Sequence, residues 1–164
     1  MHINIIKCVP RGKFVPFSWI VRASQGTKWS HYAFEYEIDG KKMVSDAVIG
    51  GIREMERSEW LRKYEVIDVV PISLPCNPED IREWVSAKLG TKYSLLQNIG
   101  IGLITIGILS RNPFGRNLES LVCHEWCLVT VARFAKIEIG DSDNYDFNRA
   151  DEVFESRNEQ YEKR

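Results

Sequence analysis

HYAFEYEIDGKKMVSDAVI, residues 31–49, carries the clearest local signal in the chain. Aromatic and β-branched residues flank the dipeptide Asp39-Gly40, a pattern that predicts two antiparallel strands joined by a two-residue turn of a primed type. We therefore expect a hairpin with strands over 31–38 and 41–49.

The first strand of this hairpin has two faces of different chemistry, because successive side chains of a strand point to opposite sides. His31, Ala33, Glu35 and Glu37 share one face, and the other face, which we expect in the core, carries Tyr32, Phe34, Tyr36 and Ile38. A two-residue turn places Asp46 opposite Ala33 and diagonal to His31. A carboxylate there can accept a hydrogen bond from the imidazole and fix its tautomer. Glu35 is the competing partner, and a solvated polar face without function is the simplest alternative.

Length and composition predict one α+β domain over residues 1–164, fraying over about 155–164. Hydrophobic residues make up 44% of the chain and charged residues 27%, as in ordinary globular proteins. The 22 basic and 23 acidic residues are mixed along the chain, with no basic block. We therefore expect no nucleic-acid partner.

The N-terminal MHINIIKCVPRGK has no basic start followed by an apolar core, so we expect no secretory signal and, by default, a cytoplasmic location. The segment LLQNIGIGLITIGIL, residues 95–109, is shorter than the roughly 20 residues that cross a bilayer. It is expected to be a buried helix or a hydrophobic lid, and peripheral lipid contact is an alternative. The sequence predicts no oligomeric state.

Further elements follow from turn and cap signals. Proline at the start and glycine at the end predict a helix over 16–26, and Asn77-Pro78 opens a helix that stops at Gly90. The remaining expectations are a strand over 4–9, a strand over 64–74 that is continuous or broken at Pro71, and a helix from a Ser120 cap to about Lys136.

SLVCHEWCLVTVARF, residues 120–134, places a thiol in the first turn of this last helix. Exposed N–H groups and the helix dipole lower the pKa of a thiol such as Cys123, and the same N–H groups can hold an oxyanion. Cys127, one turn further, is expected to be buried and inert. Simple core packing of Cys123 is the alternative.

Metal binding is poorly supported by the pattern. Structural zinc needs four ligands, and besides Cys123 and Cys127 only scattered residues could complete a site: Cys8, Cys76, His2, His31 and His124. DSDNYDFNRADE, residues 141–152, has Asp146 where a calcium loop needs glycine, so a capped loop is the better interpretation. We expect no metal and no cofactor.

Four stretches occur in an order that resembles the circularly permuted papain-fold amidases. They are FSWIVRASQGTKWSHYAF (17–34), MVSDAVIGGI (43–52), LGTKYS (89–94) and CHEW (123–126). That superfamily includes permuted relatives of NlpC-type cell-wall hydrolases and, more distantly, lecithin:retinol acyltransferase-like proteins. The resemblance implies a permuted papain-like fold, with a small antiparallel sheet or barrel packed against helices.

The resemblance also implies roles for individual residues. Cys123 would attack a carbonyl, His31 would act as general base and then general acid, and Asp46 would orient His31, with Glu35 as the fallback. Tyr93 is a candidate cleft or oxyanion residue, and an ordinary packing tyrosine is the alternative. His124 stands where relatives carry a small residue, which bears on the oxyanion hole or on access, and Asp46 stands where they often carry Glu, His or Gln.

Three functions follow from this constellation. The first is a cysteine hydrolase that cleaves an amide of a peptide or peptidoglycan stem through an acyl-thioester. The second is a thiol acyltransferase or lipid deacylase acting on a lipid ester, with 95–109 as the lipid contact. The third is a non-catalytic binding module. A cell-wall substrate would require release by lysis or dedicated secretion.

Overall fold

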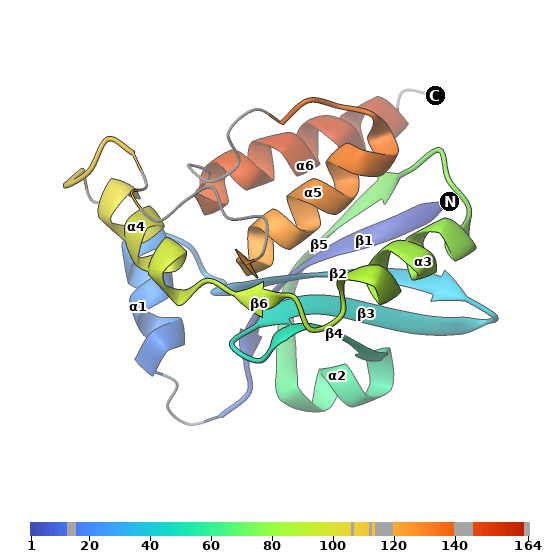
Figure 1. Cartoon of the computed structure of the whole chain (residues 1–164), viewed down its shortest axis with the longest axis horizontal. Coiled ribbons are helices and arrows are strands. Elements are labelled where there is room, and N and C mark those ends of the chain that lie inside the picture. The colour runs from blue at the N-terminus through green and yellow to red at the C-terminus, as the bar shows by residue number, and fades with distance from the viewer. Residues whose placement is uncertain (13–15, 106, 112, 114–119, 140–145, 163–164) are drawn as a thin grey trace.

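A computed structural model describes residues 1–12, 16–105, 107–111, 113, 120–139 and 146–162. Its centre is an open antiparallel sheet of five strands in the order β4-β3-β2-β1-β5 (Figure 1). These strands are β1 (His2–Pro10), β2 (His31–Ile38), β3 (Lys41–Val48), β4 (Gly51–Glu56) and β5 (Tyr64–Ser73). The expected α+β class with an antiparallel sheet packed against helices is confirmed.

The described residues form six helices around the sheet: α1 (Pro16–Gln25), α2 (Arg57–Lys63), α3 (Pro78–Lys88), α4 (Leu95–Thr105), α5 (Cys123–Ala135) and α6 (Phe147–Glu162). Helices α3, α5 and α6 lie on one side of the sheet and α2 on the other, while α1 and α4 lie together at one end (Figure 1). A short parallel pair, β6 (Lys92–Tyr93) and β7 (Ser120–Leu121), leads into α5. No helix in the described part of the chain is long and apolar enough to span a bilayer.

The predicted hairpin is confirmed together with its register. Ile38 pairs with Lys41 and Ala33 with Asp46. Asp39 and Gly40 have φ angles of 53° and 70°, the left-handed values that a type I′ turn requires. The turn therefore fixes which residues of β3 share a face with His31.

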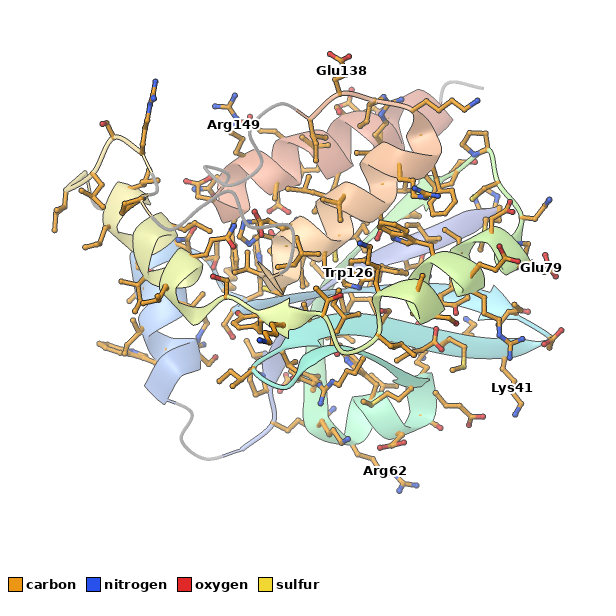
Figure 2. All side chains as sticks on the ribbon, viewed as in Figure 1. Lys41, Arg62, Glu79, Trp126, Glu138 and Arg149 are labelled. Atoms are coloured by element: carbon orange, nitrogen blue, oxygen red, sulfur yellow. The ribbon has the colours of Figure 1, made fainter. Side chains whose placement is uncertain are left out.

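The main core lies between the sheet and helices α3, α5 and α6. Tyr32, Phe34 and Tyr36 of β2 are buried here, on the face that the alternation predicted. Trp126 of α5 lies at the centre of this layer (Figure 2), donates a hydrogen bond of 3.0 Å to Ser45 Oγ, and stacks on Trp84 of α3. These contacts hold α5 over the strands that carry His31 and Asp46.

A smaller core fills the opposite face, where α2 covers the sheet. Trp60 of α2 is fully buried there among Ile6, Cys8, Ala33 and Val44. Neither α2 nor β4 was expected from the sequence. Strand β4 forms a second hairpin with β3, in which Val48 pairs with Gly51 and Ile49 and Gly50 form the turn, and α2 begins directly after β4.

Gly51 is required by a close approach at the start of β4. Its φ is 105°, and a Cβ atom there would lie 2.8 Å from the carbonyl oxygen of Thr91. Two backbone hydrogen bonds join β4 to the chain just before β6. Ile52 N donates to Thr91 O at 3.0 Å, and Gly90 N donates to Ile52 O at 2.9 Å. The chain entering β6 is thereby attached to the edge of the sheet.

Several expected boundaries differ from the observed ones. β5 is continuous through Pro71, which an edge strand tolerates because one of its sides has no pairing strand. The expectation that Ser120 caps the cysteine helix is wrong, because Ser120 belongs to β7 and the helix begins at Cys123. Helix α6 continues to Glu162, within the region where fraying was expected.

Candidate active site

His31 and Asp46 form a buried hydrogen-bonded pair. His31 is the first residue of β2, and its Nε2 lies 2.9 Å from Asp46 Oδ2 on β3. Asp46 is completely buried and His31 nearly so. The diagonal contact expected from the hairpin register is therefore present.

Two further side chains hold the Asp46 carboxylate. Arg53 of β4, which pairs with Asp46 across the sheet, donates from Nε to Oδ1 at 2.7 Å, and a second guanidinium nitrogen donates to Oδ2 at 3.0 Å. The indole N–H of Trp60 donates to Oδ2 at 3.1 Å. Burial alone would raise the pKa of Asp46, but the hydrogen bonds from His31 and Arg53 lower it well below its usual range. Asp46 is thus an ionised hydrogen-bond acceptor that orients the imidazole of His31.

Tyr64 covers the outer side of this network. Its ring stacks on the imidazole of His31 with centroids 5.1 Å apart and on Trp60 at 4.7 Å. Arg53 donates a hydrogen bond of 3.0 Å to the Tyr64 hydroxyl, while burial is the main cause that raises the pKa of Tyr64 to about 12. The phenol therefore stays neutral and fixes the plane of the imidazole.

Glu35, the alternative partner of His31, is engaged elsewhere. It lies on the same face of β2 but accepts a hydrogen bond of 3.2 Å from Asn4 and pairs with Arg57 and Lys42. The structure therefore places Asp46, and not Glu35, beside the imidazole.

Cys123 is the first residue of α5, where backbone N–H groups lack partners within the helix. The helix start is braced by Glu125, whose carboxylate accepts a hydrogen bond of 3.2 Å from Val122 N and another from Gln97 of α4. The Cys123 side chain is only 2% exposed. The side chains of His31 and His124 both act on its thiol.

The thiol and the imidazole shift each other's protonation toward an ion pair. Burial opposes charge on Cys123, but hydrogen bonds from His124 and His31 lower its pKa to about 6. Burial likewise opposes charge on His31, but its hydrogen bonds to Asp46 and Cys123 raise its pKa to about 9. Between those values the favoured state is thiolate and imidazolium, the reactive form of a cysteine nucleophile.

The other thiols have the opposite character. Burial raises the pKa of Cys8 and of Cys127 well above the ordinary value, and burial also raises that of the partly exposed Cys76. Cys127 is fully buried, as the sequence predicted.

Among the described residues, no group of three or more His, Cys, Asp and Glu is arranged to hold a metal ion. Residues 141–145 of the 141–152 stretch lie outside the described residues, and Asp146 caps α6 by accepting a hydrogen bond of 2.9 Å from Arg149 N.

A cleft of about 320 Å³ opens onto His31. Its walls come from α1, the β3–β4 turn and β6, with lining residues Pro10, Ser18, Ser30, His31, Ala47, Val48, Ile49, Gly50, Tyr64 and Tyr93. Tyr93 is therefore among the residues that line the cleft. Cys123 is not among the residues that line the cleft.

His124 lies in the interior and not in the cleft. Its ring packs edge-on against Phe147 of α6 at 5.4 Å and against Tyr32 at 6.5 Å. His124 acts on the site by lowering the pKa of Cys123, and it is not among the residues that line the cleft.

Comparison of the sequence with protein-family models and with curated proteins finds no match. The site therefore rests on its own geometry. Sequence reasoning missed Arg53, Trp60 and Tyr64. Arg53 was accessible in principle, because reading Ile49-Gly50 as a second two-residue turn would have placed it opposite Asp46. Nothing local to Trp60 or Tyr64 indicates that they pack on the pair.

Proposed function

We propose that this protein is a cysteine-dependent hydrolase that cleaves an amide bond through an acyl-thioester on Cys123. The observation that carries the proposal is the chain of contacts from Cys123 to His31 to Asp46, in which the thiol begins a helix and the carboxylate is buried. Nucleophile, base and orienting acid are each in contact with the next, as in other cysteine and serine acyl-transfer enzymes.

The reaction would proceed in two halves. In the first, Cys123 Sγ bonds to the carbonyl carbon, the oxyanion is held by N–H groups at the start of α5, and His31 protonates the leaving nitrogen as the C–N bond breaks. In the second, His31 takes a proton from water, the hydroxide attacks the thioester, and the Cys123 thiolate leaves. Because the proton already resides on His31 in the ion pair, no separate activation of the thiol is needed.

The resemblance to permuted papain-fold amidases favours a peptide or peptidoglycan-stem amide. A lipid ester is the second candidate, favoured by a specific observation. No Asp, Glu, Lys or Arg is among the described residues that line the cleft, and most of its exposed surface is apolar. Such a lining suits an acyl chain better than a charged peptide.

The test is capture of the acyl-enzyme. Purified protein is incubated with peptide amides, peptidoglycan stem peptides and phospholipid in parallel, and the mass of each cysteine-containing peptide is measured after acid quenching. We expect an acyl adduct on Cys123 and product release that is lost in Cys123→Ala. Cys76→Ala is the matched control and should retain both.

Turnover that survives in Cys123→Ala would contradict the proposal. So would a complete lack of adducts in a protein whose Cys123 also alkylates no faster than Cys76, a result that favours a non-catalytic binding module.

A further inference from the structure

Helix α1 presents apolar side chains to solvent and polar ones to the interior. Trp19 and Ile20 are 65% and 54% exposed, whereas Ser18 and Gln25 are 7% and 5% exposed. Both buried polar side chains have hydrogen-bond partners. Gln25 accepts a hydrogen bond of 3.1 Å from Phe147 N, and Ser18 Oγ lies 2.5 Å from the hydroxyl of Ser30. A surface helix surrounded by water ordinarily has the opposite arrangement.

Helix α4 repeats this inversion. Leu96 and Ile99 are 58% and 48% exposed, while Gln97 is 3% exposed and donates its hydrogen bond to Glu125. Helices α1 and α4 contact each other at one end of the molecule (Figure 1). We call the exposed apolar residues of these two adjoining helices, Trp19, Ile20, Leu96 and Ile99, the α1–α4 face. Exposed apolar residues on adjoining elements mark a candidate binding surface.

The charges of the chain are segregated along the sequence, around the two helices of this face. Residues 11–30 and 88–118, which contain α1 and α4, carry eight Lys and Arg residues and no Asp or Glu. All 23 acidic residues therefore belong to the rest of the chain, and the near-zero net charge conceals this division. Of these basic residues, Arg22 belongs to α1, and Lys28 and Lys92 are three residues from the end of α1 and the start of α4. Basic residues near an apolar surface that includes Trp are typical of surfaces that bind anionic membranes.

The α1–α4 face adjoins the cleft. Ser18 of α1 and Tyr93, which precedes α4 by two residues, both line the cleft, and Ile49 at its border is 74% exposed. A surface that met this face would therefore also meet the entrance to His31.

We infer that the α1–α4 face docks on an anionic lipid bilayer, with Trp19, Ile20, Leu96 and Ile99 in the interfacial layer. A second copy of the chain is a poorer occupant, because a symmetric contact would bring two segments without acidic residues together. The docking itself does not depend on the chemistry at Cys123. It deepens the proposed function by placing the cleft at a membrane surface.

The test is co-sedimentation of the full chain, as Cys123→Ser, with vesicles of phosphatidylcholine alone or mixed with phosphatidylserine at about two to one. We expect stronger binding to the mixed vesicles, weakened by added salt. Trp19→Ala/Ile20→Ala should lower the partition coefficient at least about tenfold. The matched control is Ile67→Ala/Val69→Ala, which removes apolar side chains that are 39% and 41% exposed on β5 and should leave binding unchanged.

Failure to bind mixed vesicles overturns the inference, as does an equal loss in the β5 control. Light scattering of the same samples identifies the other occupant: self-association that the α1 double variant abolishes would assign the face to a second copy instead. The Trp19→Ala/Ile20→Ala substitutions are also made with Cys123 intact, and alkylation of that thiol should match wild type. Vesicle binding by a protein whose Cys123 is unreactive would refute only the proposed function. A reactive Cys123 in a protein that does not bind vesicles would refute only the docking.

Discussion

The reactivity of this protein depends on a few side chains whose charges support one another. Asp46 is held ionised by Arg53, and the negative charge of Asp46 in turn favours the imidazolium form of His31. The positive imidazolium then favours the thiolate of Cys123. Changes at the far end of this chain of contacts should therefore be detected at the thiol.

The first prediction concerns the pH dependence of the thiol. Below about pH 6 the thiolate of Cys123 gains a proton, and above about pH 9 the imidazolium of His31 loses one, so the ion pair exists between those values. Iodoacetamide should alkylate Cys123 at pH 7 at least about tenfold faster than Cys76, read for each cysteine by mass spectrometry. Ultraviolet absorbance of the thiolate during titration checks the same pKa without requiring reagent access. His31→Ala should remove most of the difference, and alkylation of Cys123 only after unfolding would contradict the pair.

The second prediction separates the two candidate orienting acids. Asp46→Asn removes the charge that supports the imidazolium, so the pKa of Cys123 should rise and its alkylation midpoint should move up by about one to two pH units. Glu35→Gln is the matched control, because Glu35 contacts Asn4 and Arg57 instead of His31. An equal shift of the alkylation midpoint in both variants would show that general surface charge, and not the contact with Asp46, determines the pKa of the Cys123 thiol.

At the scale of elements, the start of α5 is the feature that positions the nucleophile. Glu125 accepts from Val122 N at the helix start and from Gln97 of α4, so one buried carboxylate joins two helices. A carboxylate in the first turn also interacts favourably with the helix dipole. The position of Cys123 thus depends on Glu125, a residue of the CHEW stretch to which the sequence pattern assigned no role.

The third prediction tests this brace. Glu125→Ala should lower the free energy of unfolding by about 1–2 kcal/mol, because it removes the helix-start acceptor and leaves a buried partner unsatisfied. Urea denaturation followed by circular dichroism measures the change. Glu138, exposed beyond the end of α5 and pointing outward in Figure 2, supplies the control: Glu138→Ala should change stability by less than about 0.5 kcal/mol. Equal effects would mean that Glu125 does not brace the helix.

At the scale of the whole molecule, the sheet and the last helix are joined by a buried lysine. Lys7 of β1 is 2% exposed and pairs with Asp68 of β5 at 3.3 Å and with Asp151 of α6 at 3.0 Å. Asp151 also accepts a hydrogen bond of 2.8 Å from Tyr32, next to His31. The packing of α6 is therefore connected to the strand that carries the site.

The fourth prediction follows from this connection. Lys7→Met should destabilise the fold by about 3 kcal/mol, because it leaves the largely buried Asp151 carboxylate without its cation. Thermal unfolding measures the loss. Lys41→Met removes an exposed ion pair with Glu56 of similar length, 3.2 Å, and should cost less than about 1 kcal/mol. A small loss in both would indicate that water replaces the lysine.

Local patterns in the sequence were sufficient for the hairpin. Alternation and the Asp39-Gly40 turn determine the register, and with it the diagonal contact of Asp46 with His31, because both depend on neighbours in the chain. The limits of α1 and α3 follow from their proline, asparagine and glycine signals in the same way. Predicted boundaries were wrong where pairing with a distant segment decided them. Ser120, for example, pairs with Lys92 of β6 and so belongs to a strand.

The sequence by itself thus determined the α+β class and the hairpin register that places Asp46 diagonal to His31, and it left Glu35 open as the competing partner. Only the tertiary structure decided that Cys123 meets His31 and that Arg53, Trp60 and Tyr64 enclose the pair. These contacts join segments far apart in the chain. Their distances are set by how α5 and α2 pack on the two faces of the sheet, and no local periodicity encodes that packing.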